Sequence, residues 1–399
     1  MIGTLLRGIP YYFVFFLLFL LFKKYNKIVS NVKAIGIGAY GTNIPSLVRF
    51  EDRRRKRLLN RAYLLLFFFL GLRGYVYTDF VNYKPFFDML EGFSNLTEVL
   101  LLKGWEPGFV IYTALCKTII PNYFVWNAIS TIIDLFLLYK ILERYSSNHL
   151  MSLMVFFVIG AMPLEFNVLR NAKAIFLFLY ALRFIEERQM WKYIVVISIA
   201  CLFHISSIVY FPLYFILHKK WPKWFLWTIY IAGAVIVFFQ INIVSDIISR
   251  ISFAEESRLE HLTNHLDDLS GYSSLFGNIE RLITMLIVIL LYNKIANNNG
   301  NCMFVNMYVL VYASFMFCSA SAVMVQRFQY MFIAAFWILY PLLIKYAKQH
   351  KNQMVYIFVT ALLAMKLLII ASNPHLLYEN VITGVSDFDA KVNYVEQNF

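Results

Sequence analysis

Residues 150–168 read LMSLMVFFVIGAMPLEFNV, and residues 171–187 read NAKAIFLFLYALRFIEE. A helix that crosses a membrane needs about 20 mostly apolar residues, and each of these stretches comes close to that length. Charged side chains are costly in lipid, so Glu165 and Arg170 at the junction are expected to face protein or a polar cavity. The segment therefore predicts two membrane helices joined at a charged turn.

The composition extends this prediction to the whole chain. Of its 399 residues, 60% are hydrophobic, whereas soluble domains contain roughly 45–50% apolar residues. We therefore expect an all-α fold, a polytopic transmembrane helical bundle of about 11–12 membrane helices. The net charge of +13 is concentrated in short loops, which indicates cytoplasmic loops rather than nucleic-acid binding. The four cysteines show no CxxC spacing, so neither a metal site nor a disulfide framework is expected.

Ten apolar runs are clear candidates for spanning helices. The run 107–120 is ambiguous because it is short and flanked by prolines, and 192–217 is ambiguous because it is long and carries His204 in its middle. The first run lacks a small-residue cleavage site and is followed by lysines, so we interpret it as a retained anchor. The ten clear runs are 5–22, 58–76, 123–142, 150–168, 171–187, 224–243, 279–296, 303–321, 328–345 and 354–371.

Loop charge predicts the orientation of these helices. Segment 23–61 holds eleven Lys or Arg and two acids, so the positive-inside rule places it in the cytoplasm. The loops 77–122 and 245–278 then fall outside. We divide the chain into an N-terminal anchor helix with a basic cytoplasmic loop (1–57), a transmembrane core (58–345), and a last transmembrane helix with an outer tail (346–399).

Two ways of threading the middle of the chain remain open. In one, 107–120 lies on the outer surface or re-enters the membrane from it, Arg170 is outside, and 192–217 is a bent hairpin with His204 near its outer tip. In the other, both runs cross once and Arg170 is inside. The prolines beside 107–120 and the basic residues near 188–192 favour the first arrangement.

The first outer loop carries groups suited to chemistry on sugars. Arg73, Asp79 and Tyr83 stand where a predicted helix emerges from the membrane, and Trp105 and Glu106 follow later in the loop. A carboxylate placed there is able to act as a general base or to orient a sugar hydroxyl. The alternative interpretation is that these residues are interfacial anchors and part of the aromatic belt.

Three further residues stand out in apolar surroundings. Arg170 presents a planar fork suited to phosphate oxygens, although a Glu165–Arg170 pair that only anchors the loop is the alternative. His204 is able to accept a proton or, when charged, to bind phosphate, although a lone histidine in an apolar helix is more often a core group. Arg327 is an arginine on the predicted outer side, which opposes the usual charge bias and favours a specific role over snorkelling.

Five segments resemble the EpsG family, the Wzy-like polymerases of bacterial surface polysaccharides. The resemblance runs from about residue 58 to about 345, and its most specific parts are Arg170 with Ala174 and the Leu-Phe-His at 202–204. The aspartate-bearing first loop is also similar to the GT-C membrane glycosyltransferases, so GT-C-like outer loops are expected. The segments are LRGYVYTDFVNYKPFF (72–87), EPGFVIYTALCK (106–117), LRNAKAIFLFLYAL (169–182), ACLFHISSIVYFPLYF (200–215) and QRFQYMF (326–332).

The resemblance implies a reaction. A growing polysaccharide, such as O-antigen, capsule or exopolysaccharide, would be moved from undecaprenyl pyrophosphate onto the next lipid-linked repeat unit. This would take place at the outer face of the bacterial cytoplasmic (inner) membrane, in a multi-pass protein. The partners would be the lipid-linked donor and acceptor, membrane lipid, a chain-length regulator and a flippase, with no nucleic acid.

The resemblance also suggests a role for each candidate residue. Catalysis is assigned to Glu165, Arg170, His204 and Asp79. Pyrophosphate binding is assigned to Arg73, Arg170 and Arg327, whose charges remove the need for a metal or other cofactor. Sugar binding is assigned to Glu106, Tyr83 and Trp105. The alternatives are an O-antigen ligase, another glycosyltransferase acting on lipid-linked sugars, or a transporter of an anionic glycolipid.

Overall fold

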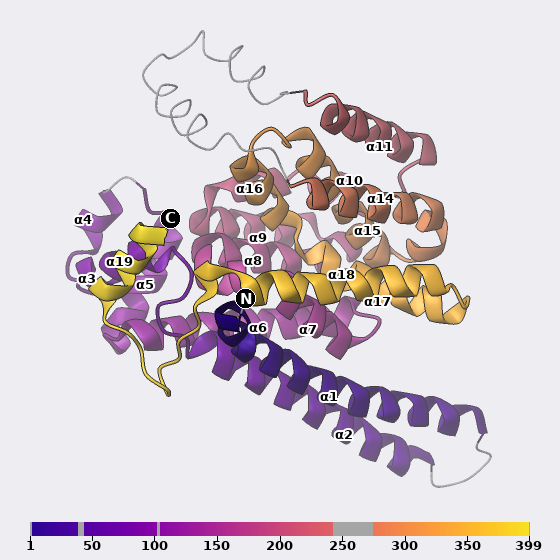
Figure 1. The fold of residues 1–399 in the computed structure, drawn as a ribbon, viewed down its shortest axis with the longest axis horizontal. Coiled ribbons are helices and arrows are strands. Elements are labelled where there is room, and N and C mark those ends of the chain that lie inside the picture. Colours follow the sequence, from indigo (N-terminus) through magenta and orange to yellow (C-terminus); the bar gives the residue numbers. More distant parts are fainter. Residues whose placement is uncertain (1, 39–43, 102–103, 242–273, 399) are drawn as a thin grey trace. The chain divides into compact units, whose positions relative to one another are not determined.

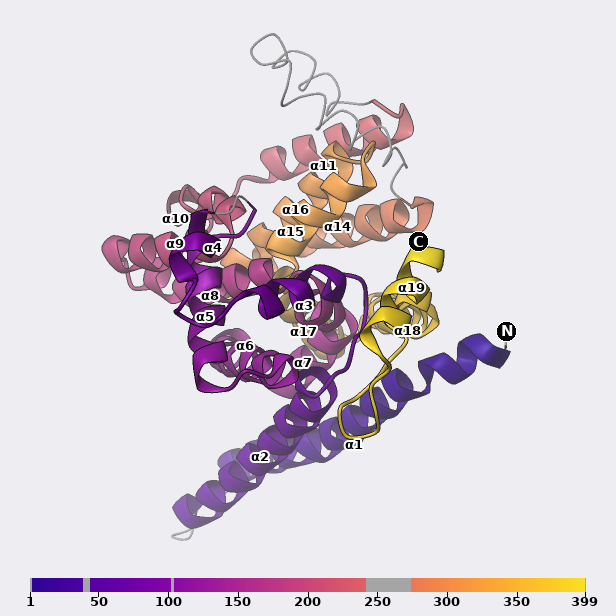
Figure 2. The same ribbon diagram turned by 90° about the vertical axis from the view of Figure 1, so that its left-hand side faces the viewer.

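The structure, a computed structural model, describes residues 2–38, 44–101, 104–241 and 274–398 (Figures 1 and 2). Within these ranges the backbone is mostly helical and contains no β-strand, only isolated bridges that involve Arg73, Asn380 and Gly384. The predicted all-α fold is confirmed. The predicted outer loop 245–278 lies, up to residue 273, outside the described residues.

Polar caps fix where many of the helices begin. Asn122 follows Pro121 and accepts hydrogen bonds from the backbone N–H groups of Phe124 and Val125, which starts the helix α6 (Tyr123–Tyr145). Such side chains replace the hydrogen-bond partners that the first turn of a helix lacks. The same function is served at other helix starts by Asn148, Ser274, Asn298 and Ser321.

The chain divides into two compact units. The first comprises residues 1–181, 194–208 and 363–399, and the second comprises 182–193 and 209–362. The division into 1–57, 58–345 and 346–399 stays a prediction.

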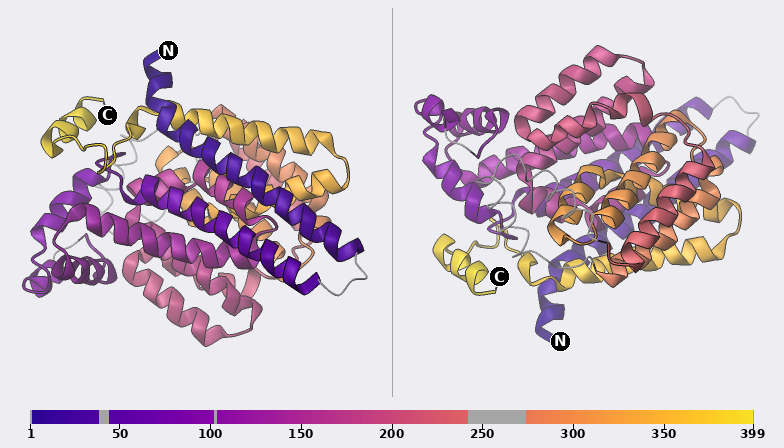
Figure 3. Two further views of the ribbon diagram at one scale, coloured as in Figure 1. Left: turned by 90° about the horizontal axis from the view of Figure 1, so that it is seen from below. Right: turned by 90° about the horizontal axis from the view of Figure 1, so that it is seen from above.

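The first unit holds most of the N-terminal half. Its helices begin with α1 and α2, which pack side by side, and α1 also packs on α7 (Figure 3). The elements up to the unit boundary are α1 (Ile2–Gly38), α2 (Ile44–Leu66), η1 (Phe67–Gly71), α3 (Phe80–Met89), α4 (Leu96–Leu101), α5 (Pro107–Ile119), α6, α7 (His149–Val158), η2 (Pro163–Asn167), α8 (Leu169–Glu186) and α9 (Met190–Phe203).

The second unit is built around one buried helix. Helix α15 packs against α11, α14, α16 and α17, and most of its side chains are buried. The remaining elements of the chain are η3 (Ile205–Tyr210), α10 (Leu213–Ile216), α11 (Lys223–Phe238), α14 (Leu275–Ile295), α15 (Asn299–Phe317), α16 (Ala322–Phe332), α17 (Ala334–Gln349), α18 (Gln353–Ser372), η4 (Pro374–Leu376) and α19 (Phe388–Asn398).

Several helices are long and apolar enough to cross a membrane. In the described ranges there are five, or six if the bent pair Met324–Phe332 and Ala334–Gln349 crosses as one span. The polytopic bundle is therefore confirmed, but full-length spans are fewer than the 11–12 expected. The five are Leu6–Ser30, Tyr123–Tyr145, Leu275–Ile295, Asn299–Phe317 and Gln353–Ser372.

The difference in number arises because some apolar runs form short or interrupted helices. The predicted span 150–168 contains the ten-residue helix α7 and then the π-helical turn Pro163–Asn167. The predicted span 58–76 is the end of α2 followed by a second π-helical turn, Phe67–Gly71. Such turns are commonly found at functional sites, and neither is visible in the hydropathy of the sequence.

The basic segment that was expected to be a loop is largely helical. Helix α1 continues through Lys23 to Gly38, and α2 already includes the basic run 53–57. Tyr11, Val14, Leu18 and Tyr25 are buried and recur at helical spacing, so one stripe of α1 packs against the protein.

The segment after α18 packs against the loop that follows η1, the predicted first outer loop. The backbone N–H of Val381 donates to the Leu72 carbonyl, and that of Gly74 donates to the Glu379 carbonyl, both at 2.8 Å. The rings of Tyr378 and Phe69 stack with centroids 4.2 Å apart. The predicted outer tail is therefore an ordered brace on the loop that carries Arg73 and Asp79.

Candidate functional site

Glu106 and Pro107 place a carboxylate at the start of α5. Pro107 occupies the first helical position, where a missing N–H costs no hydrogen bond. Glu106 stands just before it, and its carboxylate makes no capping hydrogen bond. The side chain is therefore left for partners outside α5, while the positive end of the helix dipole favours its negative charge.

Gly108 brings α5 into close contact with the end of α9. A Cβ atom at position 108 would lie 2.8 Å from both the Cβ atom and the carbonyl oxygen of Leu202. Only a residue without a Cβ atom fits at this separation. Because Leu202 lies two residues before His204, the contact sets the distance between the start of α5 and that histidine.

His204 stands where the helical run is broken. Helix α9 ends at Phe203 and η3 begins at Ile205. The chain then folds back, because the hydroxyl of Tyr193 donates to the carbonyl of Tyr210 at 2.6 Å. A continuous helix would hold those two residues roughly 25 Å apart along its axis. The run 192–217 is thus bent at His204, as the first threading predicts, and the side of the membrane on which this bend lies stays a prediction.

Glu106 binds both Arg170 and His204. Its Oε2 lies 2.6 Å from Nη1 of Arg170, and its Oε1 lies 2.8 Å from Nδ1 of His204. A carboxylate accepts hydrogen bonds, so Nδ1 of His204 is the donor, and in the neutral imidazole this arrangement leaves the lone pair on Nε2. The side chains of Arg170, Glu106 and His204 are 27%, 15% and 28% exposed, so all three reach the surface of the first unit. We call this set the Glu106 triad.

The electrostatics of the triad favour an ionised Glu106. Burial works against the negative charge, but the hydrogen bond with His204 and the positive charge of Arg170 outweigh it and lower the pKa of Glu106. Arg170 also donates to the Gly104 carbonyl at 2.8 Å. One carboxylate therefore holds a cation and orients an imidazole at the same time.

Aromatic rings support the triad from one side. The guanidinium carbon of Arg170 lies 4.7 Å from a ring centre of Trp105, a contact in which the aromatic face attracts the cation. Trp105 stacks on Phe86 with centroids 3.9 Å apart, and the centroid of the Tyr83 ring lies 5.9 Å from that of Trp105. Tyr83 is only 4% exposed, so its ring is a packed support rather than an open platform.

Asp79 joins this region from the predicted first outer loop. Its backbone N–H and the hydroxyl of Thr78 both donate to Oδ1 of Asn167, each at 3.0 Å. These bonds tie the loop to the segment just before Arg170. Burial raises the pKa of Asp79 to about 6, and the charge of Arg170 opposes that rise.

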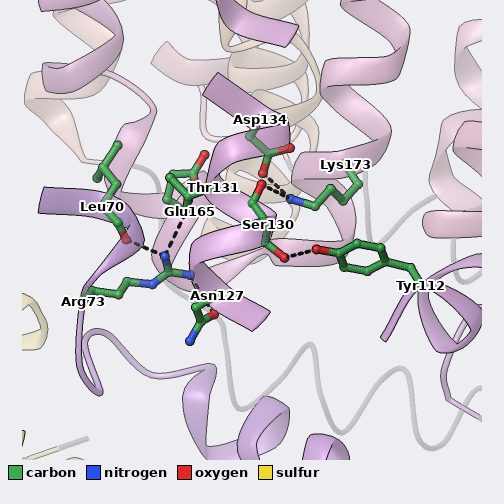
Figure 4. Close-up of polar contacts among 9 residues, drawn as sticks. All are labelled: Leu70, Arg73, Tyr112, Asn127, Ser130, Thr131, Asp134, Glu165 and Lys173. Atoms are coloured by element: carbon green, nitrogen blue, oxygen red, sulfur yellow. Dashed lines mark hydrogen bonds and ion pairs between the residues drawn. The ribbon is translucent and has the colours of Figure 1, made fainter. Parts of the chain in front are cut away.

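Arg73 belongs to a second polar cluster, which is buried (Figure 4). Its side chain donates to the Leu70 carbonyl at 2.6 Å, to Thr131 at 3.2 Å and to Oδ1 of Asn127 at 3.1 Å. Leu70 lies in the turn that ends the helical run, where carbonyl groups lack partners. Arg73 is only 3% exposed and satisfies these groups, so it does not reach a substrate at the surface in this arrangement.

Glu165 lies in the same cluster. Oε2 of Glu165 accepts a hydrogen bond from Thr131 at 2.9 Å, and its side chain has no exposed surface. Lys173 donates to Asp134 and to the Ser130 carbonyl, and this pair is buried as well. The cluster joins α6, η2 and α8, as Figure 4 shows.

The sequence analysis did not assign roles to Asn127, Asp134 or Lys173. A signal was present, because Asn127, Ser130, Thr131 and Asp134 recur at spacings of three, four and seven residues in an apolar helix. That spacing places them on one face of α6. We refer to Arg73, Asn127, Thr131, Asp134, Glu165 and Lys173 as the buried network.

Arg327 lies elsewhere. It is on α16 in the second unit, and its side chain is exposed. A joint clamp by Arg170 and Arg327 stays a prediction. Within the described ranges, no three His, Cys, Asp or Glu side chains gather as a set of metal ligands.

The apolar helices define a multi-pass membrane protein. The Glu106 triad lies outside the five full-length spans and forms a charged, partly exposed candidate site. The chain belongs to the EpsG family, whose family model matches residues 56–381. Membership supports a polysaccharide-polymerase role of the glycosyltransferase-like kind. No curated protein and no solved structure matches the chain.

Proposed function

We propose that the protein polymerises undecaprenyl-pyrophosphate-linked repeat units into a surface polysaccharide at the outer face of the cytoplasmic membrane, with the Glu106 triad as its active site. The observation that carries the proposal is the sharing of one carboxylate by Arg170 and His204. An oriented imidazole beside a fixed cation matches the two needs of glycosyl transfer from a pyrophosphate. These are removal of a proton from the acceptor and stabilisation of the leaving group.

The acceptor hydroxyl would attack the anomeric carbon of the donor sugar. Its proton would pass to Nε2 of His204, which has no hydrogen-bond partner among the described residues. Glu106 would stabilise the imidazolium that forms, as carboxylates do in catalytic triads. The new glycosidic C–O bond would form as the bond between the anomeric carbon and the phosphate oxygen breaks.

The leaving pyrophosphate would keep the electron pair of the broken bond. Arg170 would offset this charge with its guanidinium, which has five N–H donors; Nη1 serves Gly104 and Glu106, and the side chain also makes a hydrogen bond with Tyr83, which leaves further N–H groups for the pyrophosphate. Its stacking on Trp105 fixes the guanidinium plane before substrate arrives. Asp79 would bind a sugar hydroxyl beside Arg170.

Burial favours Glu106 and His204 over Glu165 for direct contact with the acceptor. Glu165 has no exposed surface, whereas His204 is 28% exposed. A general base must come within hydrogen-bonding reach of the proton that it removes. We therefore assign Glu165 and Arg73 to support of α6 and α8, and the base function to His204.

Purified protein with a labelled lipid-linked repeat unit tests this proposal. We expect a ladder of lengthened products from the unaltered protein and at least about a 100-fold slower ladder from Arg170→Ala. The matched control is Arg183→Ala, which removes an arginine elsewhere on α8 and should leave the ladder intact. Full activity in folded Arg170→Ala protein would contradict the assignment.

The same assay separates the competing functions. Lipid that is only redistributed across the bilayer of a vesicle would indicate a transporter. In cells, loss of a polymerase leaves single repeat units on the lipid carrier, whereas loss of a ligase leaves long polymer there. Long polymer retained on the lipid in the Arg170→Ala strain would therefore indicate a ligase.

A further inference from the structure

Helices α2 and α6 form an open apolar groove on the first unit. The groove has a volume of about 320 Å³ and is lined by Tyr63 and Leu64 from α2, by Phe67 at the start of η1, and by Ile132, Phe136 and Tyr139 from α6. Leu64, Ile132 and Phe136 are each more than half exposed. We call this the α2–α6 groove; none of its residues belongs to the Glu106 triad or to the buried network.

A polar pocket continues the groove at one end. This pocket has a volume of about 190 Å³ and shares Tyr139 with the groove. Arg55 and Lys56 line it from α2, Glu143 lines it from α6, and His149 lines it at the start of α7. We call it the basic pocket. An apolar channel that opens into a polar, cation-bearing pocket has the chemistry of a lipid with a charged head group.

The charges around the basic pocket favour an anion. Glu143 accepts a hydrogen bond from Tyr139, and Asp52 lies 3.5 Å from Arg55, so both acids offset part of the positive charge. Residues 51–57 nevertheless contain five bases and two acids, a net charge of +3. The Nε atom of Arg55 is buried and has no hydrogen-bond partner among the described residues, which leaves a donor for a bound phosphate.

His149 closes the inner wall of the pocket without adding charge. Its Nε2 lies 2.9 Å from the Tyr63 hydroxyl, and its ring packs on Tyr63 and Tyr139. Burial and the charge of Arg55 lower the pKa of His149 to about 4. Arg55 and Lys56 are therefore the cations that this pocket offers at neutral pH.

The length of the combined surface fits one leaflet of a bilayer. The lining residues recur on a single helical face from Arg55 on α2 to Phe67, the first residue of η1, a rise of roughly 18 Å. Half of a hydrocarbon core is about 15 Å thick. A lipid with its phosphate beside Arg55 would therefore extend an acyl chain along the groove towards Phe67.

We propose that the basic pocket and the α2–α6 groove together bind one anionic phospholipid, with its phosphate on Arg55 and Lys56 and an acyl chain in the groove. This site is separate from the proposed polymerase reaction, so it stands if that function fails. The basic run of α2 places the head group at the face that the positive-inside rule assigns to the cytoplasm.

Native mass spectrometry of the full-length protein in nanodiscs tests the proposal. The nanodiscs are made of phosphatidylcholine that contains phosphatidylglycerol. Inorganic phosphate is tested separately as a second probe. We expect one tightly retained phosphatidylglycerol, and about tenfold weaker retention in the double variant Arg55→Gln with Lys56→Gln. The matched control, Arg57→Gln with Arg61→Gln, removes the same charge from exposed positions of α2 outside the pocket and should retain the lipid.

A second variant tests the groove. Leu64→Trp fills the groove without changing charge, and it should weaken lipid retention while leaving the melting temperature within about 2 °C. Equal loss of lipid in the Arg57/Arg61 control would show non-specific attraction and overturn the proposal. Binding of inorganic phosphate with the same strength as the lipid would also overturn it. A dimeric mass with no retained lipid would overturn it as well, because it would assign this face to a second copy of the chain.

Discussion

Arg170 and Lys173 lie one turn apart on α8, and each meets a carboxylate in a different setting. The Arg170–Glu106 pair is 27% and 15% exposed, whereas the Lys173–Asp134 pair is 5% and 0% exposed. The accessible pair is free to exchange partners with a substrate at little cost. The buried pair is not, because separating it leaves an uncompensated charge in the interior. Burial therefore separates the proposed site for chemistry from a structural support, although each consists of a basic side chain and a carboxylate.

The largest effect is expected from a substitution that removes the buried cation. Lys173→Ala leaves Asp134 without its partner, and we expect the free energy of unfolding to fall by about 3–5 kcal/mol. Thermal unfolding of the purified protein measures the effect. The double variant Asp134→Leu with Lys173→Met removes both charges and should recover most of the loss. An unchanged melting temperature in Lys173→Ala would show that the pair is not a structural support.

A substitution in the accessible Glu106 triad should change the rate of polymer formation rather than the free energy of unfolding. His204→Gln keeps a group able to bond with Glu106 but removes the basic nitrogen, so we expect polymer formation to slow by about 100-fold. The free energy of unfolding should change by less than about 0.5 kcal/mol. Ser206→Ala, in the same bend, is the control and should be active. Normal chain extension by His204→Gln would exclude His204 as the base.

A smaller effect is expected from moving the triad without changing its members. In Gly108→Ala the new Cβ atom would lie 2.8 Å from Leu202, so α5 and α9 must move apart. Because this separates Glu106 from His204, we expect roughly a tenfold loss of rate. Ile111→Ala, at an exposed position of α5, is the control. Equal rates in both variants would show that the close approach at Gly108 does not position the triad.

The smallest expected effect is the contribution of Asp79 to the pH dependence of stability. The pKa of Asp79 is raised to about 6 by burial, so the folded protein holds its proton more firmly than the unfolded chain does. The resulting stability is present below pH 4 and is lost as the pH rises through about 6. Because Asp79 is partly exposed, we expect under about 1 kcal/mol. Between pH 4 and pH 7, the melting temperature of Asp79→Asn should vary less with pH than that of the unaltered protein. Parallel curves of melting temperature against pH for the two proteins would contradict this.

The membrane class of the protein was predictable from sequence. Glu106, Arg170 and His204 were candidates there as well, because charges in apolar surroundings are visible in a sequence, and their roles stay predictions. Their shared contact was not predictable. Glu106 is 64 positions from Arg170 and 98 from His204, and their meeting depends on the packing of α5 against α9 at Gly108. Hydropathy also hides the π-helical turns, which is why the described residues contain fewer full-length spans than the number of membrane helices expected from sequence.

The burial of Arg73 and Glu165 was equally hidden. Both stand at the ends of apolar runs, where a sequence cannot distinguish a group that faces a cavity from one that satisfies its own fold. The polar stripe on α6 held the missing information, because Asn127 and Thr131 are the partners that keep Arg73 inside.

The brace between the segment after α18 and the predicted first outer loop has a consequence for biosynthesis. The Tyr378 hydroxyl donates to the Phe69 carbonyl at 2.8 Å across 309 positions of the chain. At about 5–20 residues per second, a ribosome needs roughly 15–60 s to make the intervening residues. During that interval the loop bearing Arg73 and Asp79 lacks its brace. A nascent chain would therefore carry this loop without its brace until residue 378 has been made, which would delay the final arrangement of the proposed site.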